Sequence, residues 1–125
     1  MGSISVGIIG AGETGAPLLK LLLEAEFVKV LGVADLDSEQ PGMRLARKHG
    51  VNTTPNFMDL ARLGQDVDIL IDVTGVPDVR DQLRRHLEQT HNKHTIIMHE
   101  RIVMWVLSLI NGELVEMKHG AVEYS

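Results

Sequence analysis

Apolar residues along this chain fall into short β-prone runs that alternate with segments of helical periodicity. The β-prone runs lie at residues 4–9, 27–34, 51–54, 68–75 and 95–98. Helical spacing of apolar residues marks segments 13–25, 40–49, 57–63, 78–90 and 101–110. Strands that are apolar throughout are typical of a parallel sheet covered on both faces. The alternation therefore predicts an α/β domain in which helices connect parallel strands.

A glycine-rich turn joins the first predicted strand to the first predicted helix. It reads Gly10, Ala11, Gly12, Glu13, Thr14, Gly15. An acid, Asp35, follows twenty positions after Gly15. A G-x-G-x-x-G turn with an acid at this spacing is the fingerprint of a dinucleotide site. The first glycine permits the tight turn, the second lets the backbone approach a pyrophosphate, and the third lets the helix pack on the strand. The alternative is a glycine-rich turn that binds nothing.

The acid at the end of the second predicted strand bears on the choice of cofactor. In such a fold a carboxylate here accepts hydrogen bonds from the adenosine ribose and repels a 2′-phosphate, so Asp35 favours NAD over NADP. Asp37 takes this role if the strand ends later, and either acid can instead be a solvated loop residue. Ser38 is the expected N-cap of the next helix.

Loops at the ends of the fourth and fifth predicted strands should face the same ligand. In an open α/β sheet, ligands lie outside the carboxyl ends of the strands, beside the point where the strand order reverses. Asp72, inside the fourth strand, is expected to have a structural role, either paired or pointing towards the strand edge or a helix end. The expected cofactor-binding residues are Gly10, Gly12, Glu13, Thr14, Gly15, Asp35, Leu36, Thr74, Gly75, Val76, Pro77, His99 and Glu100.

These patterns predict a Rossmann-like doubly wound parallel sheet with strand order 3-2-1-4-5. A length of 125 residues fits a single domain. We assign residues 1–112 to the dinucleotide-binding domain and residues 113–125 to a C-terminal tail or linker stub. Arg80, Arg84 and Arg85 are expected to face solvent from the fourth helix.

The order of these motifs resembles the N-terminal cofactor domain of the Gfo/Idh/MocA family of NAD(P)-dependent oxidoreductases. The resemblance covers residues 4–101. Besides the glycine turn, residues 32–37 resemble the family's V-A-D-x-D strand ending, residues 57–60 its F-x-D-L helix, and residues 66–71 its D-x-D-x-V-x-I strand entry. The resemblance implies the Rossmann fold and a nicotinamide cofactor.

The chain departs from that family where the family carries its chemistry. In place of the family's C-E-K-P segment stand His99, Glu100, Arg101 and Ile102. Arginine stays protonated and cannot exchange a proton near neutral pH as a tuned lysine can. The family's C-terminal substrate domain has no counterpart in these residues. We therefore expect no catalytic residue and no turnover by the isolated chain.

Composition argues against several other functions. A net charge of −5 without a basic stripe argues against nucleic acid binding. The chain has no cysteine, which excludes disulfides and thiol chemistry and is compatible with the cytoplasm, where we expect the protein. The six histidines lack the spacing of a metal site and, with the exception of His99 at the end of the fifth predicted strand, are interpreted as solvated. The longest apolar stretch, residues 102–110, is about half of what a bilayer requires, so no membrane span is expected.

The segment at residues 101–110 is more apolar than a helix that covers one face of a sheet requires. Eight of its ten residues are apolar, whereas an apolar stripe of about 100° suffices for such a helix. The surplus predicts a homodimer through this helix, with Met104, Trp105 and Leu109 at the contact. The alternative is that the tail covers the helix through Leu114, Val115 and Met117.

The leading hypothesis is an NAD(H)-binding module with a sensing or regulatory role and no turnover of its own. Freestanding or appended modules of this kind occur at the front of bacterial signalling proteins. One alternative is the cofactor domain of an oxidoreductase that needs a partner domain or subunit for its substrate. A second is an interaction domain that has kept the fold and lost its ligand.

Overall fold

Five parallel strands form one sheet in a computed structural model that describes residues 2–116. The strands are β1 (Ile4–Ile9), β2 (Val28–Ala34), β3 (Thr53–Thr54), β4 (Ile69–Asp72) and β5 (Ile96–His99). The connecting helices are α1 (Gly15–Glu24), α2 (Pro41–Lys48), α3 (Met58–Ala61), the 3₁₀ turn η1 (Gly64–Asp66), α4 (Pro77–Gln89) and α5 (Glu100–Asn111). The order β3-β2-β1-β4-β5 confirms the predicted doubly wound topology.

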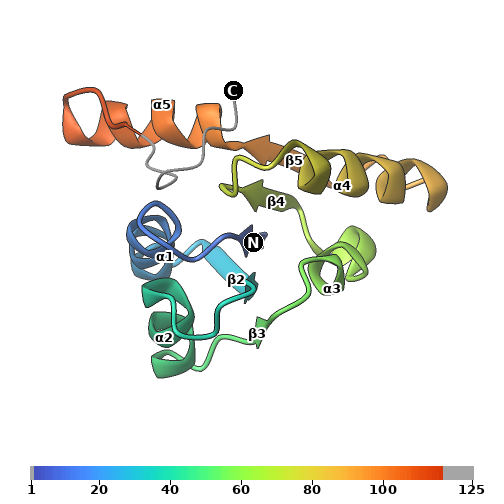
Figure 1. Cartoon of the computed structure of the whole chain (residues 1–125), viewed down its shortest axis with the longest axis horizontal. Coiled ribbons are helices and arrows are strands. Elements are labelled where there is room, and N and C mark those ends of the chain that lie inside the picture. Colours follow the sequence, from blue (N-terminus) through green and yellow to red (C-terminus); the bar gives the residue numbers. More distant parts are fainter. Residues whose placement is uncertain (1, 117–125) are drawn as a thin grey trace.

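The helices cover both faces of this sheet. Figure 1 shows α1 and α2 on one side and α3 and α4 on the other. Successive residues of β1 point to opposite faces, so Ile8 joins a core with Leu19 and Met43, and Ile9 joins a second core with Leu70 and Leu83. The near-continuous apolarity of the strands follows from this burial on two sides.

The strand register brings the carboxyl ends of the strands to a common edge. Ile9, the last residue of β1, pairs with Ala34 at the end of β2 and with Asp72 at the end of β4. Asp72 in turn pairs with His99 at the end of β5. The loops that follow β1, β2 and β4 therefore emerge together, and the predicted site residues lie in those loops, at the first residues of α1 and α4, or where β5 meets α5.

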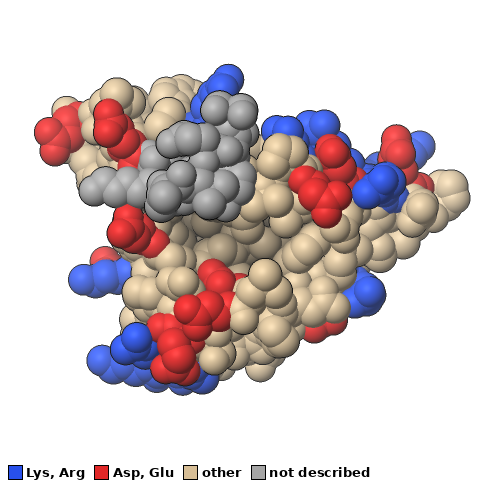
Figure 2. All heavy atoms as spheres, in the orientation of Figure 1, with Lys and Arg blue, Asp and Glu red and all other residues tan. Residues whose placement is uncertain are grey.

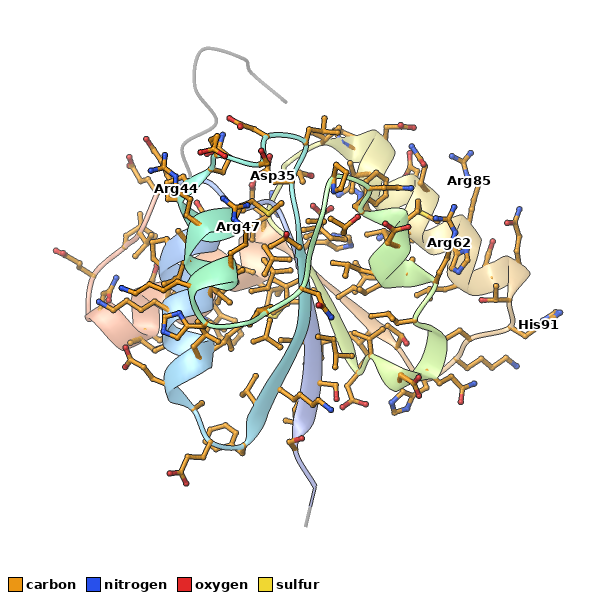
Figure 3. All side chains as sticks on the ribbon, turned by 90° about the horizontal axis from the view of Figure 1, so that it is seen from below. Asp35, Arg44, Arg47, Arg62, Arg85 and His91 are labelled. Carbon is orange, nitrogen blue, oxygen red and sulfur yellow. The ribbon has the colours of Figure 1, made fainter. Side chains whose placement is uncertain are left out.

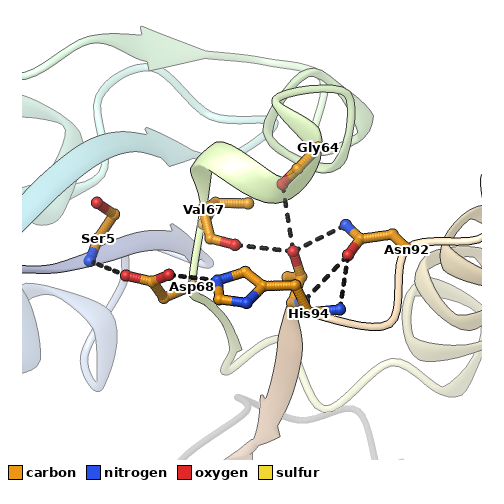
Figure 4. Close-up of polar contacts among 7 residues, drawn as sticks. Ser5, Gly64, Val67, Asp68, Asn92 and His94 are labelled. Carbon is orange, nitrogen blue, oxygen red and sulfur yellow. Dashed lines mark hydrogen bonds and ion pairs between the residues drawn. The ribbon is translucent and has the colours of Figure 1, made fainter.

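Polar side chains link three strands at the opposite edge of the sheet. Asp68, just before β4, accepts a hydrogen bond from the backbone N–H of Ser5 at 2.8 Å, and its other oxygen lies 2.6 Å from Nε2 of His94 (Figure 4). The buried Thr95 hydroxyl donates to the carbonyl of Val67 at 2.7 Å. His94 is exposed, as expected of a turn histidine, but its imidazole is also bonded to the carboxylate that precedes β4.

The loop before α2 also differs from the prediction. The N-cap position of α2 is Gln40, and Ser38 is not the cap. The reason is local: Asp35 accepts the N–H of Asp37, and Asp37 accepts the N–H of Glu39, each at 2.9 Å. Aspartate turns of this kind compete with helix formation and extend the loop as far as Gln40.

Helix α5 is held by few buried side chains. Val103 and Leu107 are buried in the core with α1, whereas Ile102, Trp105, Leu109 and Ile110 are exposed. Gly112, with a φ of 77°, ends the helix in the left-handed conformation that glycine adopts readily.

The segment after α5 partly covers it. The N–H of Val115 donates to the Ser108 hydroxyl at 2.9 Å, and its side chain packs on the core. Leu114 stays exposed, and Met117 lies outside the described residues. Among the helices described, none is long and apolar enough to cross a membrane.

Charged side chains of both signs are mixed on the surface. On the face shown in Figure 2, Lys and Arg side chains lie interspersed with Asp and Glu over α2 and α4. In α2, Arg44 and Arg47 both pair with the exposed Glu39. This face therefore carries no basic stripe.

Candidate functional site

A cavity of about 230 Å³ lies at the common edge where the strands end. It is formed between the glycine turn, the end of β2 and the loop after β4. The lining residues are Gly10, Ala11, Gly12, Glu13, Thr14, Gly15, Asp35, Gln40, Val73, Thr74 and Val76. Segments far apart in the sequence are thus brought together as the motifs predict.

The three glycines of the turn occupy their positions for different structural reasons. Gly10 has a φ of 104°, which side-chain-bearing residues rarely adopt. A Cβ atom on Gly15 would lie 2.0 Å from the carbonyl oxygen of Gly10, so any larger residue would push α1 away from the strand. A Cβ on Gly12 would meet no described atom within 3 Å, and its nearest neighbour is Oε1 of Gln40 at 3.4 Å. Gly10 and Gly15 are needed by the fold itself, whereas Gly12 leaves its backbone open to the cavity.

Asp35 fastens the end of β2 to the glycine turn. Its Oδ2 accepts the N–H of Ala11 at 2.9 Å, and its Oδ1 accepts the N–H of Asp37 at 2.9 Å. Strand β2 ends at Ala34, so Asp35 rather than Asp37 stands at the strand end. Each carboxylate oxygen can accept a further hydrogen bond. Figure 3 shows Asp35 at this edge, with Arg44 and Arg47 on the neighbouring helix α2.

Helix α2 packs directly on the glycine turn. The N–H of Gly42 donates to the carbonyl of Ala11 at 2.7 Å, and a Cβ on Gly42 would lie 2.8 Å from that oxygen. Sequence reasoning missed both Gly42 and Gln40. A glycine in the first turn of a predicted helix is a signal for such close approach, because glycine is otherwise unfavourable there.

The loop after β4 is shaped by Asp72. This carboxylate is 4% exposed and accepts two hydrogen bonds from Thr74, at 3.0 Å from the N–H and 2.7 Å from the hydroxyl. The Thr74 oxygen then accepts the N–H of Val76 at 3.1 Å. Asp72 is therefore paired, as expected for a carboxylate in a buried strand, and it sets the loop that lines the cavity opposite Asp35.

Five of the predicted site residues do not line this cavity: Leu36, Gly75, Pro77, His99 and Glu100. Leu36 is 91% exposed beside Asp35. Gly75 has a φ of 68° and allows the turn into α4. His99 and Glu100 stand where β5 meets α5, beyond the cavity.

The environment of His99 favours its neutral form. Burial lowers the pKa of His99 below its ordinary value of 6.5; the charge of Asp72 opposes this shift, and Arg80 and Arg84 add to it. Arg80 is only partly exposed, and its Nε is buried with no hydrogen-bond partner among the described residues. The prediction that Arg80 faces solvent is therefore wrong.

Comparison with known proteins identifies the family. The family model described as the homoserine dehydrogenase NAD-binding domain matches residues 10–107. The chain belongs to this family. It is an NAD-binding Rossmann domain, and NAD(H) is its cofactor, as the glycine turn and Asp35 predicted. The expected resemblance is thus confirmed for an NAD-binding Rossmann domain, and the assignment to the Gfo/Idh/MocA family is not confirmed.

Relatives of this NAD-binding domain are longer dehydrogenases. The chain is 35% identical over 72 residues to an acetaldehyde dehydrogenase of Desulfitobacterium hafniense, covering 57% of this chain and 24% of that protein. It is 32% identical over 87 residues to an acetaldehyde dehydrogenase of Mycolicibacterium gilvum, covering 68% and 28%. The chain thus spans about a quarter of the length of the curated relatives it matches.

Solved structures share the fold of this domain. A homoserine dehydrogenase of S. aureus superposes with a TM-score of 0.64 at 15% identity, covering 90% of this chain and 30% of that one. GenD2 from gentamicin A biosynthesis, in complex with NAD, gives a TM-score of 0.59 at 16% identity, covering 79% and 34%. At these identities the likeness establishes the fold alone.

Proposed function

We propose that this chain binds NAD(H) in the cavity at the carboxyl edge of its sheet, as the cofactor domain of an oxidoreductase. The observation that carries the proposal is the open face of Gly12 beside the carboxylate of Asp35. Backbone N–H groups at Gly12, Glu13 and Thr14, with the N-terminus of α1, would hold the diphosphate. Asp35 would hold the adenosine ribose and disfavour NADP(H). Once bound, the nicotinamide would accept or donate a hydride.

The remaining predicted residues have roles along the same ligand. We assign Thr74, Gly75, Val76 and Pro77 to the side of the cofactor opposite Asp35, and Leu36 to the edge of the adenosine. His99 and Glu100 are assigned to the nicotinamide side, because β5 lies next to β4 at the same edge. A neutral His99 can accept or donate a hydrogen bond there.

Binding of NADH to Gly12→Val tests this site. Because a side chain at Gly12 would project into the cavity, we expect the affinity for NADH to fall by about 10-fold or more, equivalent to about 1.4 kcal/mol. Gly2→Val is the matched control, since a Cβ there meets nothing within 4 Å. Isothermal calorimetry measures both. Equal affinity in Gly12→Val and in the native chain places the ligand elsewhere.

We further propose that substrate groups come from a partner domain or subunit. The relatives extend well beyond the matched region, and Arg101, in the first turn of α5, stands where the Gfo/Idh/MocA pattern has lysine. We expect no reduction of NAD by the isolated chain with acetaldehyde, homoserine, sugars, polyols or amino acids. If NAD is reduced in proportion to the amount of chain added, as measured by the absorbance of NADH, the chain is itself catalytic and this proposal is wrong.

A sensing or regulatory module without turnover is the second candidate. Arg101 favours it, because arginine cannot exchange a proton near neutral pH as a tuned lysine can. The ligand-free interaction domain remains the outcome if no nucleotide binds.

Three statements stay predictions: closer kinship with the Gfo/Idh/MocA family, the division at residue 112 and a cytoplasmic location. Val115 packs on the core, so the segment after Gly112 contributes contacts to the domain.

We propose that the exposed face of α5 forms a homodimer. A shallow apolar groove is lined by Arg101, Ile102, Met104, Trp105, Ser108 and Leu114. Trp105 is 60% exposed and Leu109 66% exposed. Apolar patches rich in tryptophan and methionine are typical of protein contacts, and a two-fold pairing is the commonest one.

A further inference from the structure

Gln40 is held at the rim of the cavity by its backbone. It occupies the N-cap position of α2, and its own N–H donates to the carbonyl of Asp37 at 3.2 Å. Two residues later, Gly42 fastens α2 to the carbonyl of Ala11 in the glycine turn. The start of α2 therefore cannot move away from the turn without breaking this bond.

The side chain of Gln40 lies beside Gly12, and both residues line the cavity. Its Oε1 is 3.4 Å from the point where a Cβ of Gly12 would lie. Its Nε2 donates to Oδ2 of Asp37 at 3.4 Å, a long and therefore weak hydrogen bond. The carboxylate of Asp37 also accepts the N–H of Glu39 at 2.9 Å, so it keeps a partner if the amide leaves.

The charges around Gln40 suit a neutral donor. Asp35, Asp37 and Glu39 place carboxylates on this loop, and the two arginines of α2 both pair with Glu39. A neutral side chain that donates an N–H to an anionic ligand at Gly12 would stabilise that ligand without adding negative charge to the loop. At present Oε1 of Gln40 faces Gly12 and Nε2 faces Asp37, so the amide offers its N–H to such a ligand only after it turns. The weak bond to Asp37 makes this exchange inexpensive.

We propose that Gln40 is a cofactor-binding residue whose Nε2 donates a hydrogen bond to the diphosphate of NAD(H). This inference rests on the proposed function and adds to it a residue outside the glycine fingerprint. The amide would leave Asp37 and turn to the phosphate oxygens at Gly12. Asp35 would still hold the ribose, so Gln40 acts on the diphosphate and not on the adenosine.

The test compares Gln40→Ala and Gln40→Glu for binding of NADH and of adenosine, which has no phosphate. We expect Gln40→Ala to weaken NADH binding by about 10-fold, as for a hydrogen bond to a charged group, and Gln40→Glu to weaken it further through charge repulsion. Adenosine affinity should stay unchanged in both variants. Gln82→Ala is the matched control, because Nε2 of Gln82 donates to Asp78 at 2.7 Å on α4, outside the cavity lining.

The outcomes separate this inference from the proposed function. If the native chain does not bind NADH, the proposed function fails. If the native chain binds NADH and both Gln40 variants match it, the role of Gln40 alone is wrong. An equal loss of NADH and adenosine affinity would also overturn the diphosphate assignment, because it would place the effect on the adenosine half or on the fold. Tighter NADH binding by Gln40→Ala would show that the side chain only obstructs the site.

Discussion

At the scale of single residues, Asp35 fastens the glycine turn and is also the proposed ribose contact. Its two oxygens accept backbone N–H groups from the glycine turn and from its own loop, and each has capacity left for a ribose hydroxyl. Sequence spacing predicted the ribose contact. The link to Ala11 was not visible in the spacing, because it depends on how β1 and β2 align.

Asp35→Asn should weaken NADH binding and reduce the preference for NAD(H) over NADP(H). Asparagine has one acceptor oxygen in place of two, so one of the two N–H groups loses its partner. The loss of negative charge also removes repulsion of a 2′-phosphate. We expect NADH affinity to fall by about 10-fold and NADPH affinity to fall less. Fluorescence titration of both nucleotides measures this.

Asp37→Asn provides the comparison for Asp35→Asn. Asp37 lies beyond the strand end and does not line the cavity. Its variant should keep the preference for NADH. A loss of preference in Asp37→Asn, with Asp35→Asn unaffected, would move the ribose contact to Asp37.

At the scale of elements, Asp68 joins β1, β4 and β5 at the edge opposite the cavity. The pKa of Asp68 lies below its ordinary value of 3.8. The largest cause is the hydrogen bond from the N–H of Ser5, and the hydrogen bond with His94 adds to this effect. A carboxyl group whose folded pKa is lowered stabilises the fold above its unfolded pKa. That contribution is lost as the pH falls below 3.8 and through the folded pKa.

Asp68→Asn should therefore lower the free energy of unfolding at neutral pH. The variant should also lose less stability than the native chain on acidification through this range. Urea unfolding at a series of pH values measures both effects. Asp66→Asn, in the exposed turn η1, is the control and should follow the native profile. Identical pH profiles for the native chain and Asp68→Asn would contradict the role of this link.

At the scale of the whole molecule, the proposed homodimer depends on the exposed side of α5. Its buried side, Val103 and Leu107, completes the core with α1. Its other side carries Trp105 and Leu109 into solvent, and Val115 covers the helix only in part. Burial of such a surface against a second copy would remove this apolar area from water.

We expect the native chain to sediment as a dimer at tens of micromolar and Trp105→Glu as a folded monomer. A charge in the centre of an apolar contact would have to lose water without a partner. Phe27→Glu is the matched control, since Phe27 is a comparably exposed aromatic residue, at 65%, before β2. A monomeric native chain in sedimentation equilibrium would refute the dimer.

The sequence by itself determined the strand order, the glycine turn and the acid that follows β2. These features depend on local spacing and on apolar runs, which can be identified in the sequence without knowing which distant segments are in contact. It also indicated a structural role for Asp72, with pairing as one expected arrangement, since a carboxylate in an apolar strand needs a partner or an exit to water.

Only the tertiary structure decided which other side chains meet at the cavity. Gln40 and Gly42 reach the glycine turn because the register of β1 and β2 places α2 beside Ala11. Arg80 is drawn inward, and His94 reaches Asp68, because α4 and the segment before β5 pack next to β4. Such contacts join residues tens of positions apart, and their geometry follows from packing and strand register, which no short motif records.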